Sequence, residues 1–189
     1  MKNFLFRKAT DNDIWDVHAW RNAEKVRNAM LTQHEISGEE HQKWWARKMQ
    51  DPSFSMMLLE QDGLVKAVQI FFDIQQEKTA WWAFYFTPHA PEEMGPMLQF
   101  WKMTELAGLS YAFDTLKLDQ LTCEVLLSNQ GVLNWHKRFG ANVIDQSTSQ
   151  NTQHYDLEVM EFTRTGYVDK RDTRWAQPLS EITIQTELY

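Results

Sequence analysis

Segments that resemble β-strands recur along the whole chain. Apolar and polar residues alternate at Leu121, Cys123, Val125 and Leu127, with Thr122, Glu124 and Leu126 on the other face. Asp62-Gly63 is a strong hairpin signal between two such segments. An antiparallel meander is therefore predicted in the middle of the chain. The predicted strands are 4–9, 54–60, 64–74, 79–87, 121–127, 141–145 and 155–164.

Helical spacing of apolar residues separates these strands. Ser37-Gly38-Glu39-Glu40 is a capping box that predicts the start of one helix, and Asp51-Pro52 predicts its end. Apolar residues recur at helical spacing between Met97 and Leu116, and Gly140 is placed to cap a later helix. The predicted helices are about 14–22, 23–30, 38–50, 97–116 and 129–139.

This order of elements predicts a mixed α/β (α+β) fold, with a central, mostly antiparallel twisted sheet and helices on both faces. Residues 1–164 are expected to form this domain, and residues 165–189 a C-terminal extension. Ile182, Ile184, Thr186 and Leu188 alternate within the extension. The alternation predicts an added strand, or an arm that grips a second copy of the chain in a homodimer.

Composition narrows the function classes. The formal net charge of −7 disfavours a nucleic-acid partner, because phosphate neutralisation needs clustered cations. The single cysteine, Cys123, excludes an internal disulfide and a cysteine-rich zinc module. No apolar run is long enough for a signal peptide or a membrane span, so a cytoplasmic location without a membrane partner is expected. The six histidines are scattered, which disfavours a metal site.

Three features of the sequence are candidates for chemistry. A helix that opens at Gly95-Pro96 presents free backbone N–H groups that bind phosphate, although an ordinary βα turn has the same pattern. Glu124, in an apolar strand, is a candidate general base or a solvent-facing residue. His136, on an apolar helix face, is a candidate general acid or a structural histidine.

A second group of residues predicts a ligand pocket or a helix–helix contact. An arginine binds phosphate by its planar fork, and tryptophan rings stack on bases or sugars. The sequence alone favours a helix–helix contact, with the arginine in a surface ion pair. They are Arg21, His41, Trp44 and Trp45.

The element order and the segment from Met94 to Asn142 resemble the GCN5-related N-acetyltransferase superfamily. Its R/Q-x-x-G-x-G/A loop aligns with Ala90 to Gly95, where only the last glycine is kept, so pyrophosphate binding would fall to backbone amides. Within the superfamily, the chain resembles the PseH subfamily of UDP-4-amino-4,6-dideoxy-N-acetyl-altrosamine N-acetyltransferases. The matching segments are 20–22, 26–30, 37–44, 95–98, 111–113, 116, 118, 123–126, 129 and 136–140.

The resemblance implies acetyl-CoA as cosubstrate, no metal, and an acetyl transfer by direct attack of an amine. The implied acceptor is a UDP-linked 4-amino sugar on the route to pseudaminic acid, which decorates flagellin and surface glycans. Glu124 falls at the position of a general base, and His136 replaces a tyrosine that protonates the CoA thiolate. The implied cofactor-binding residues are Trp82, Ala83, Phe84, Phe86, Thr87, Met94, Gly95, Pro96 and Asn129. The implied substrate-binding residues are Arg21, His41, Gln69, Phe71 and Tyr85.

Two other functions remain open from the sequence. The same fold serves protein N-terminal acetyltransferases of the ribosomal-protein type, which would need a wide acidic groove for a peptide. The degenerate loop at Ala90 to Gly95 would also suit a non-catalytic binding module.

Overall fold

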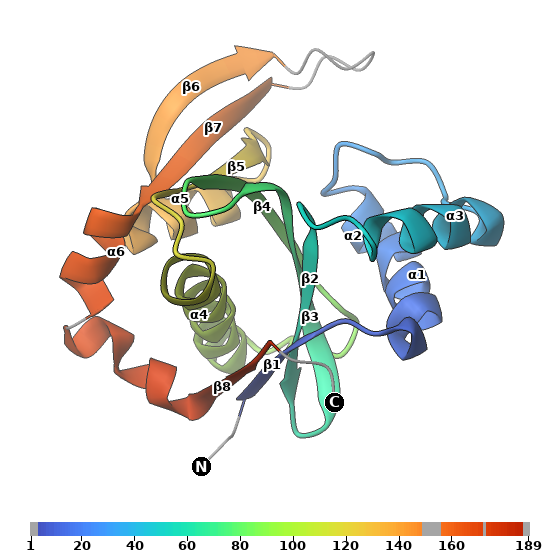
Figure 1. Ribbon diagram of the computed structural model, residues 1–189, viewed down its shortest axis with the longest axis horizontal. Helices are drawn as coiled ribbons and strands as arrows, with labels where there is room; N and C mark the ends of the chain where they lie inside the picture. Colours follow the sequence, from blue (N-terminus) through green and yellow to red (C-terminus); the bar gives the residue numbers. More distant parts are fainter. Residues whose placement is uncertain (1–3, 149–155, 172, 187–189) are drawn as a thin grey trace.

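The computed structural model describes residues 4–148, 156–171 and 173–186. The strands among them form one eight-stranded sheet in the order β6-β7-β5-β4-β3-β2-β1-β8 (Figure 1). Neighbouring strands are antiparallel except for the parallel pairs β1/β8 and β4/β5. The predicted fold class, a mostly antiparallel mixed sheet with helices on both faces, is confirmed. The strands are β1 (Phe4–Lys8), β2 (Ser55–Gln61), β3 (Leu64–Gln75), β4 (Thr79–Phe86), β5 (Gln120–Leu126), β6 (Asn142–Thr148), β7 (Asp156–Thr163) and β8 (Ile182–Gln185).

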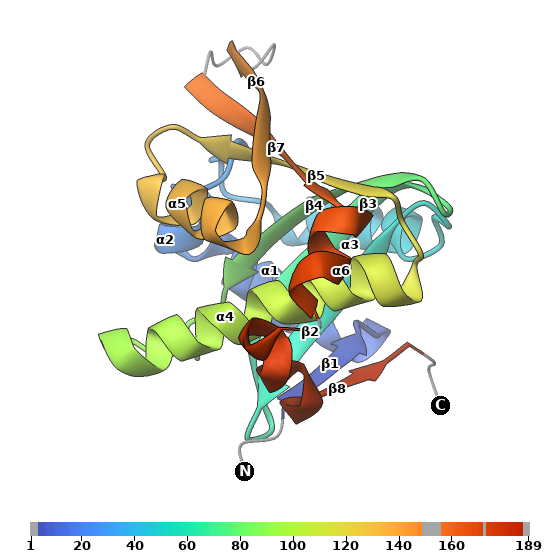
Figure 2. The same cartoon turned by 90° about the vertical axis from the view of Figure 1, so that its left-hand side faces the viewer.

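The helices divide between the two faces of the sheet, each over its own hydrophobic core. In Figure 1 α4 lies on the opposite side of the central strands from α1, α2 and α3, and Figure 2 shows α4 running along the sheet. Phe100, Leu106 and Phe113 belong to the first core, and Val17 and Trp45 to the second. The helices are α1 (Ile14–Asn22), α2 (Glu24–Arg27), α3 (Gly38–Lys48), α4 (Met94–Ser110), α5 (Gln130–Phe139) and α6 (Arg164–Arg171).

Strands β4 and β5 pair only at their first residues. Thr79 pairs with Gln120, Ala80 with Leu121 and Trp81 with Thr122. Beyond this point β4 continues to Phe86 along β3, and β5 continues to Leu126 along β7. The two parallel strands therefore separate in the middle of the sheet, and each leaves backbone groups unpaired on the side that faces the gap.

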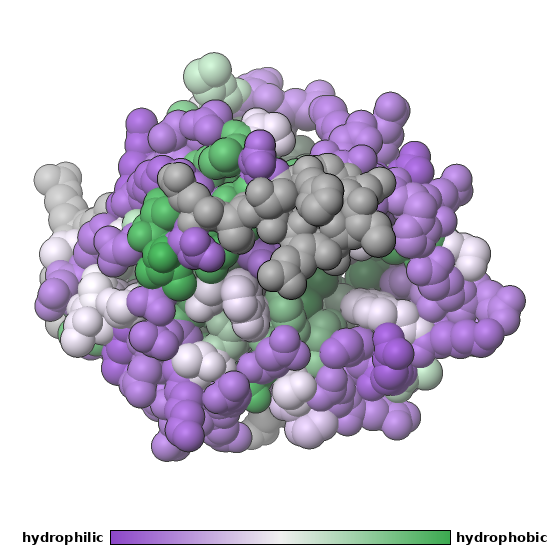
Figure 3. Space-filling view, turned by 90° about the horizontal axis from the view of Figure 1, so that it is seen from above, coloured by the Kyte–Doolittle hydropathy of each residue, from purple (hydrophilic) through white to green (hydrophobic). Residues whose placement is uncertain are grey.

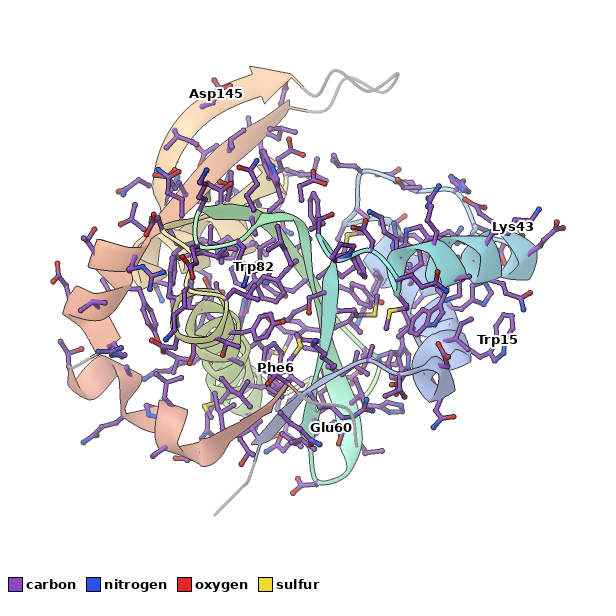
Figure 4. All side chains as sticks on the ribbon, viewed as in Figure 1. Phe6, Trp15, Lys43, Glu60, Trp82 and Asp145 are labelled. Atoms are coloured by element: carbon purple, nitrogen blue, oxygen red, sulfur yellow. The ribbon has the colours of Figure 1, made fainter. Side chains whose placement is uncertain are left out.

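Helix α4 packs closely on the sheet at Gly108. A Cβ atom built at this glycine would collide with Gln69 Oε1 and would lie 2.8 Å from Trp82 Cζ2. Gln69 fills the space beneath the helix, where its Nε2 donates to the carbonyl of Thr104 and its Oε1 accepts from Trp82 Nε1. Figure 4 labels Trp82 in this position between α4 and the central strands. The glycine thus permits the close approach that sets the height of α4 above the sheet.

Element boundaries differ from the prediction at helix ends and in the tail. Helix α4 begins at Met94 instead of Met97, and it continues into a π-helical turn at Tyr111–Thr115. In the tail, Ile182–Gln185 forms β8, which pairs parallel with β1 of the same chain. Two residues of the predicted elements, Tyr155 and Leu188, lie outside the described residues.

Candidate active site

A cavity of about 1100 Å³ occupies the gap between β4 and β5. Its wall includes β4 from Trp81 to Phe86, β5 from Cys123 to Leu126, and residues of α1 and α2 on one side and of α4 and α5 on the other. Seen from above in Figure 3, apolar residues lie in a recess within a hydrophilic rim. The cavity thus joins the two faces of the sheet through the gap.

The backbone of β4 forms one wall of this gap. Tyr85 belongs to the core beneath α1 and α3, whereas Phe84 and Phe86 pack against the core beneath α4. Because alternate residues of a strand direct their N–H and C=O groups to opposite edges, every second residue beyond Trp81 has these groups free of β3. The wall can therefore bind a ligand that carries amide groups, or polarise a carbonyl.

The N-terminus of α4 provides further free donors. The N-cap residue, Glu93, makes no side-chain capping bond in the described structure, and the first turn holds no acidic residue. Space beside Gly95 is open, because no described atom beyond its chain neighbours and its own helix backbone lies within 4 Å of a Cβ built there. The first-turn N–H groups and the positive end of the helix dipole are thus available to a phosphate. Met97 and the loop residues Pro91 and Glu92 line the cavity.

Several polar residues line the cavity on the face of α1 and α2, among them the candidate site residues Glu124, Tyr85 and Arg21. Glu124 is exposed on β5, and Tyr85 is buried on β4. Arg21, from the last turn of α1, donates from Nη2 to the carbonyl of Thr32 at 2.9 Å. Its Nη1 is buried without a hydrogen-bond partner among the described residues. Burial lowers the pKa of Arg21, and the charge of Arg27 lowers it further. Burial raises the pKa of Tyr85.

The opposite face of the gap holds a buried histidine. His136 of α5 lines the cavity, is 2% exposed, and has its Nδ1 2.6 Å from Oε1 of Glu105 on α4. Burial is the largest single influence and lowers the pKa of His136, but Glu105 and Cys123 together raise the pKa above its usual value. The candidate base and the candidate acid therefore lie on opposite faces of the sheet.

Aromatic and amide side chains complete the wall near α5. Asn129 caps α5 by accepting from the backbone N–H of Val132, and it also lines the cavity. Trp101 of α4 stacks on Trp135 of α5, with ring centroids 5.1 Å apart. The indole N–H groups of both tryptophans are buried without a partner in the described part of the chain. Trp101 lines the cavity, so its N–H can donate to a ligand oxygen.

The structure brings together most of the residues that the sequence predicts for the site. Three residues of the predicted cofactor set, Met94, Gly95 and Pro96, open α4 outside the cavity wall. Thr87 lines the cavity, but its hydroxyl already donates to the carbonyl of Val65 at 2.8 Å. The predicted residues in the wall are Arg21, Trp82, Ala83, Phe84, Tyr85, Phe86, Thr87, Glu124, Asn129 and His136.

Three predicted substrate-binding residues do not reach the cavity. Gln69 and Phe71 are fully buried beneath α4. Gln69 donates a hydrogen bond to the carbonyl of Thr104, and Phe71 stacks on Trp82 with ring centroids 6.3 Å apart. His41 is 3% exposed, and its Nε2 lies 2.9 Å from the carbonyl of Ile14. These side chains are engaged in helix–sheet and helix–helix packing, so the structure does not bring them to the cavity with the other predicted residues.

Glu105 contacts the candidate site through His136, and it was not singled out from the sequence. It lies within the apolar run of α4, and it is 0% exposed. A lone carboxylate among apolar residues of a helix implies a buried partner, because a buried charge needs a counter-charge. The signal was present, but its partner, His136, is 31 residues away in the chain.

The described residues contain no group of three His, Cys, Asp or Glu side chains that could hold a metal ion. In the part of the chain that the structure describes, no helix is long and apolar enough to cross a membrane.

Comparisons with known proteins identify the fold. No family model matches the sequence, and no curated protein matches it. Among solved structures, the chain is similar to spermidine N-acetyltransferase from Vibrio cholerae in complex with CoA and spermine. The TM-score is 0.76 at 14% identity, over 88% of this chain and 98% of that chain.

A dodecameric structure of spermidine N-acetyltransferase from Vibrio cholerae gives a similar result. The TM-score is 0.72 at 14% identity, over 90% of this chain and 99% of that chain. The protein therefore has the GCN5-related N-acetyltransferase fold that the sequence resemblance implied.

Proposed function

We propose that the protein is an N-acetyltransferase that moves the acetyl group of acetyl-CoA to the amino group of a small molecule. The observation that carries this proposal is the gap between β4 and β5, which opens a cavity through the sheet toward the free N-terminus of α4. The gap offers backbone hydrogen bonds to an amide-bearing arm, and the helix offers N–H groups to a pyrophosphate. The similar structure with bound CoA supports the same cosubstrate here.

The chemistry needs few side chains. Acetyl-CoA supplies an activated acetyl group, and the protein supplies proximity, orientation and proton transfer. Glu124, on the face of α1 and α2, accepts the proton of the attacking amine. His136, on the face of α4 and α5, donates a proton to the departing thiolate. Free N–H groups of β4 polarise the reacting carbonyl. Because these roles include no nucleophile of the protein, the amine attacks the acetyl group of acetyl-CoA directly.

We further propose that the acceptor is a nucleotide-linked 4-amino sugar, as the sequence resemblance to the PseH subfamily implies. Arg21 supports an anionic acceptor, because it lines the cavity with Nη1 unpartnered among the described atoms. A diphosphate is the kind of group that an arginine fork recognises. Residues of the long loop after α2, including Met30 and Leu31, give that part of the wall an apolar surface for a base.

A polyamine acceptor is the alternative that the similar structures raise, since those proteins are spermidine N-acetyltransferases. A polyamine carries several positive charges and needs a surplus of carboxylates. Glu24, Glu92 and Glu124 line the cavity together with Arg21 and Lys25, so the wall has little surplus negative charge. The half-buried cation of Arg21 also opposes a cationic ligand. Neither a peptide acceptor nor a purely binding role has comparable support.

Thermal unfolding with added ligands tests this proposal in steps. A ligand that binds only the native state raises the unfolding temperature by mass action. We expect acetyl-CoA to stabilise the protein, UDP to stabilise it further, and spermidine to have no effect. Stabilisation by spermidine but not by UDP would replace the sugar nucleotide with a polyamine. No response to acetyl-CoA would remove the acetyltransferase proposal.

Arg21→Lys is a matched variant for the acceptor. Lysine keeps the positive charge but lacks the planar fork, so we expect a weaker response to UDP and an unchanged response to acetyl-CoA. An equal response to UDP in both proteins would show that Arg21 does not bind the acceptor.

A further inference from the structure

The bond between Glu105 and His136 joins two elements beneath the cavity. Glu105 comes from α4 and His136 from the second turn of α5. Oε1 of Glu105 and Nδ1 of His136 lie 2.6 Å apart. The side chains are 0% and 3% exposed, respectively. Oε2 of Glu105 is buried without a hydrogen-bond partner among the described residues. In the described structure the Glu105 carboxylate therefore makes its hydrogen bond to the His136 imidazole through Oε1.

The surroundings of the imidazole are mainly aromatic. Trp82, Phe84 and Phe162 lie with ring centroids 5.4, 5.9 and 5.4 Å from that of His136. The titratable groups that face the imidazole in the described structure are Glu105 of α4 and Cys123 of β5. Phe84, Cys123 and His136 line the cavity, so this aromatic enclosure borders the space that a ligand would fill.

An isolated histidine in such a place would be neutral, because burial disfavours the charged form. Glu105 opposes this preference, since a carboxylate at hydrogen-bond distance stabilises the imidazolium. With the further contribution of Cys123, the pKa of His136 is raised above its usual value. The same bond engages Nδ1, which leaves Nε2 as the nitrogen that remains free of Glu105.

We propose that Glu105 is a positioning residue that keeps His136 protonated and oriented at the cavity wall, where the imidazolium serves the departing thiolate of the acyl transfer. The inference rests on the proposed function. His136 donates its proton to the sulfur as the carbon–sulfur bond breaks and the carbon–nitrogen bond forms, while Glu124 accepts the amine proton. Exchange with water restores both groups.

The charge of His136 can be measured without substrate. We expect the imidazole ¹⁵N shifts of the wild-type protein at about pH 7.5 to be those of an imidazolium, although an unperturbed histidine would be mostly neutral there. In Glu105→Gln we expect a neutral ring. Glu158→Gln is the matched control, because Glu158 is a buried carboxylate that pairs with Lys137, the neighbour of His136 on α5, at 3.0 Å. That variant should keep the imidazolium.

Kinetics distinguish positioning from a purely structural role. We expect Glu105→Gln to lower kcat by about 100-fold, with KM for acetyl-CoA nearly unchanged, and Glu105→Asp to restore part of the rate. Glu158→Gln should lose stability without this loss of kcat. A neutral ring in the wild-type protein, or equal losses of kcat in both glutamine variants, would overturn the inference. If the protein transfers no acetyl group while the shifts are as expected, the proposed function fails but the assigned charge stands.

Discussion

At the scale of single residues, the two candidate proton-transfer groups differ in their surroundings. Glu124 is exposed on β5 and shares a sheet face with Tyr85, whereas His136 is 2% exposed on the other face. An exposed carboxylate exchanges protons with water readily. A buried histidine must rely on a fixed partner to keep its charge, and Glu105 is that partner. The two groups are thus suited to opposite directions of proton transfer.

Glu124→Gln tests the base. The substitution keeps the shape of the side chain and removes its ability to accept a proton, so we expect kcat to fall by about 100-fold. Binding of acetyl-CoA, measured by calorimetry, should not change. An unchanged kcat would remove Glu124 from the mechanism.

The charge of His136 also predicts a pH dependence of stability. Its folded-state pKa is raised to about 10, from an unfolded value of about 6.5. The stabilisation is therefore complete below about pH 6.5, and it is lost as the pH rises through the folded-state pKa. We expect urea unfolding to show a larger deficit for His136→Gln at pH 6 than at pH 9. Lys43→Gln, which breaks an exposed pair with Glu39, should show no such trend.

The sequence predicted the polar residues of the open wall better than those of the packed interior. Glu124, Arg21 and Tyr85 lie in the cavity as expected, because strand alternation and helix periodicity determine which face a residue occupies. Gln69 and Phe71 lie outside the cavity wall, since β3 is covered on both faces and alternation does not say which face holds a ligand. Glu105 was missed because its partner is distant in the chain.

At the scale of elements, the distance between α4 and the sheet depends on Gly108. Alanine is favoured over glycine within a helix by about 1 kcal/mol, but its methyl group would collide with Gln69 and Trp82 here. We expect Gly108→Ala to lower the free energy of unfolding by about 1–3 kcal/mol in urea titrations.

Gly131→Ala is the control for this substitution. A Cβ there would make an ordinary contact, 3.6 Å from Trp101. This variant should be as stable as the wild type or slightly more so. Equal effects of the two alanines would show that α4 adjusts freely to the added methyl group.

Most strands and helices could be predicted from the sequence because hairpin signals, capping boxes and apolar spacing are local. Apolar periodicity marks α4 only from Met97, three residues after its start, since Met94-Gly95 carries no strong cap and the N-cap residue makes no side-chain bond in the described structure. The separation of β4 from β5 could not be derived from periodicity, because both strands keep their alternation where their pairing ends.

At the scale of the whole molecule, the tail completes one edge of the sheet. Strand β8 pairs with β1, and Ile182 and Ile184 pack against the main core. We expect a chain that ends at Arg171 to unfold at lower urea concentration. We also expect it to self-associate through the uncovered edge of β1. Urea unfolding and sedimentation measure these effects.

Sedimentation of the same two chains also tests the prediction that the tail serves as an arm in a homodimer. If the arm grips a second copy, sedimentation should show a dimer for the full chain and its loss in the shortened chain. An identical oligomeric state and equal stability of the two chains would contradict both roles of the tail.

The short contact between β4 and β5 has a mechanical consequence. Three residue pairs join these strands, so the sheet consists of two halves that meet along a narrow seam. One half holds β8 and β1 to β4, and the other holds β5 to β7. A molecule that hydrogen-bonds to both free edges would lengthen this seam. Amide hydrogen exchange along β4 and β5 should then slow when the ligand binds, because the two halves of the sheet would unfold together and no longer separately.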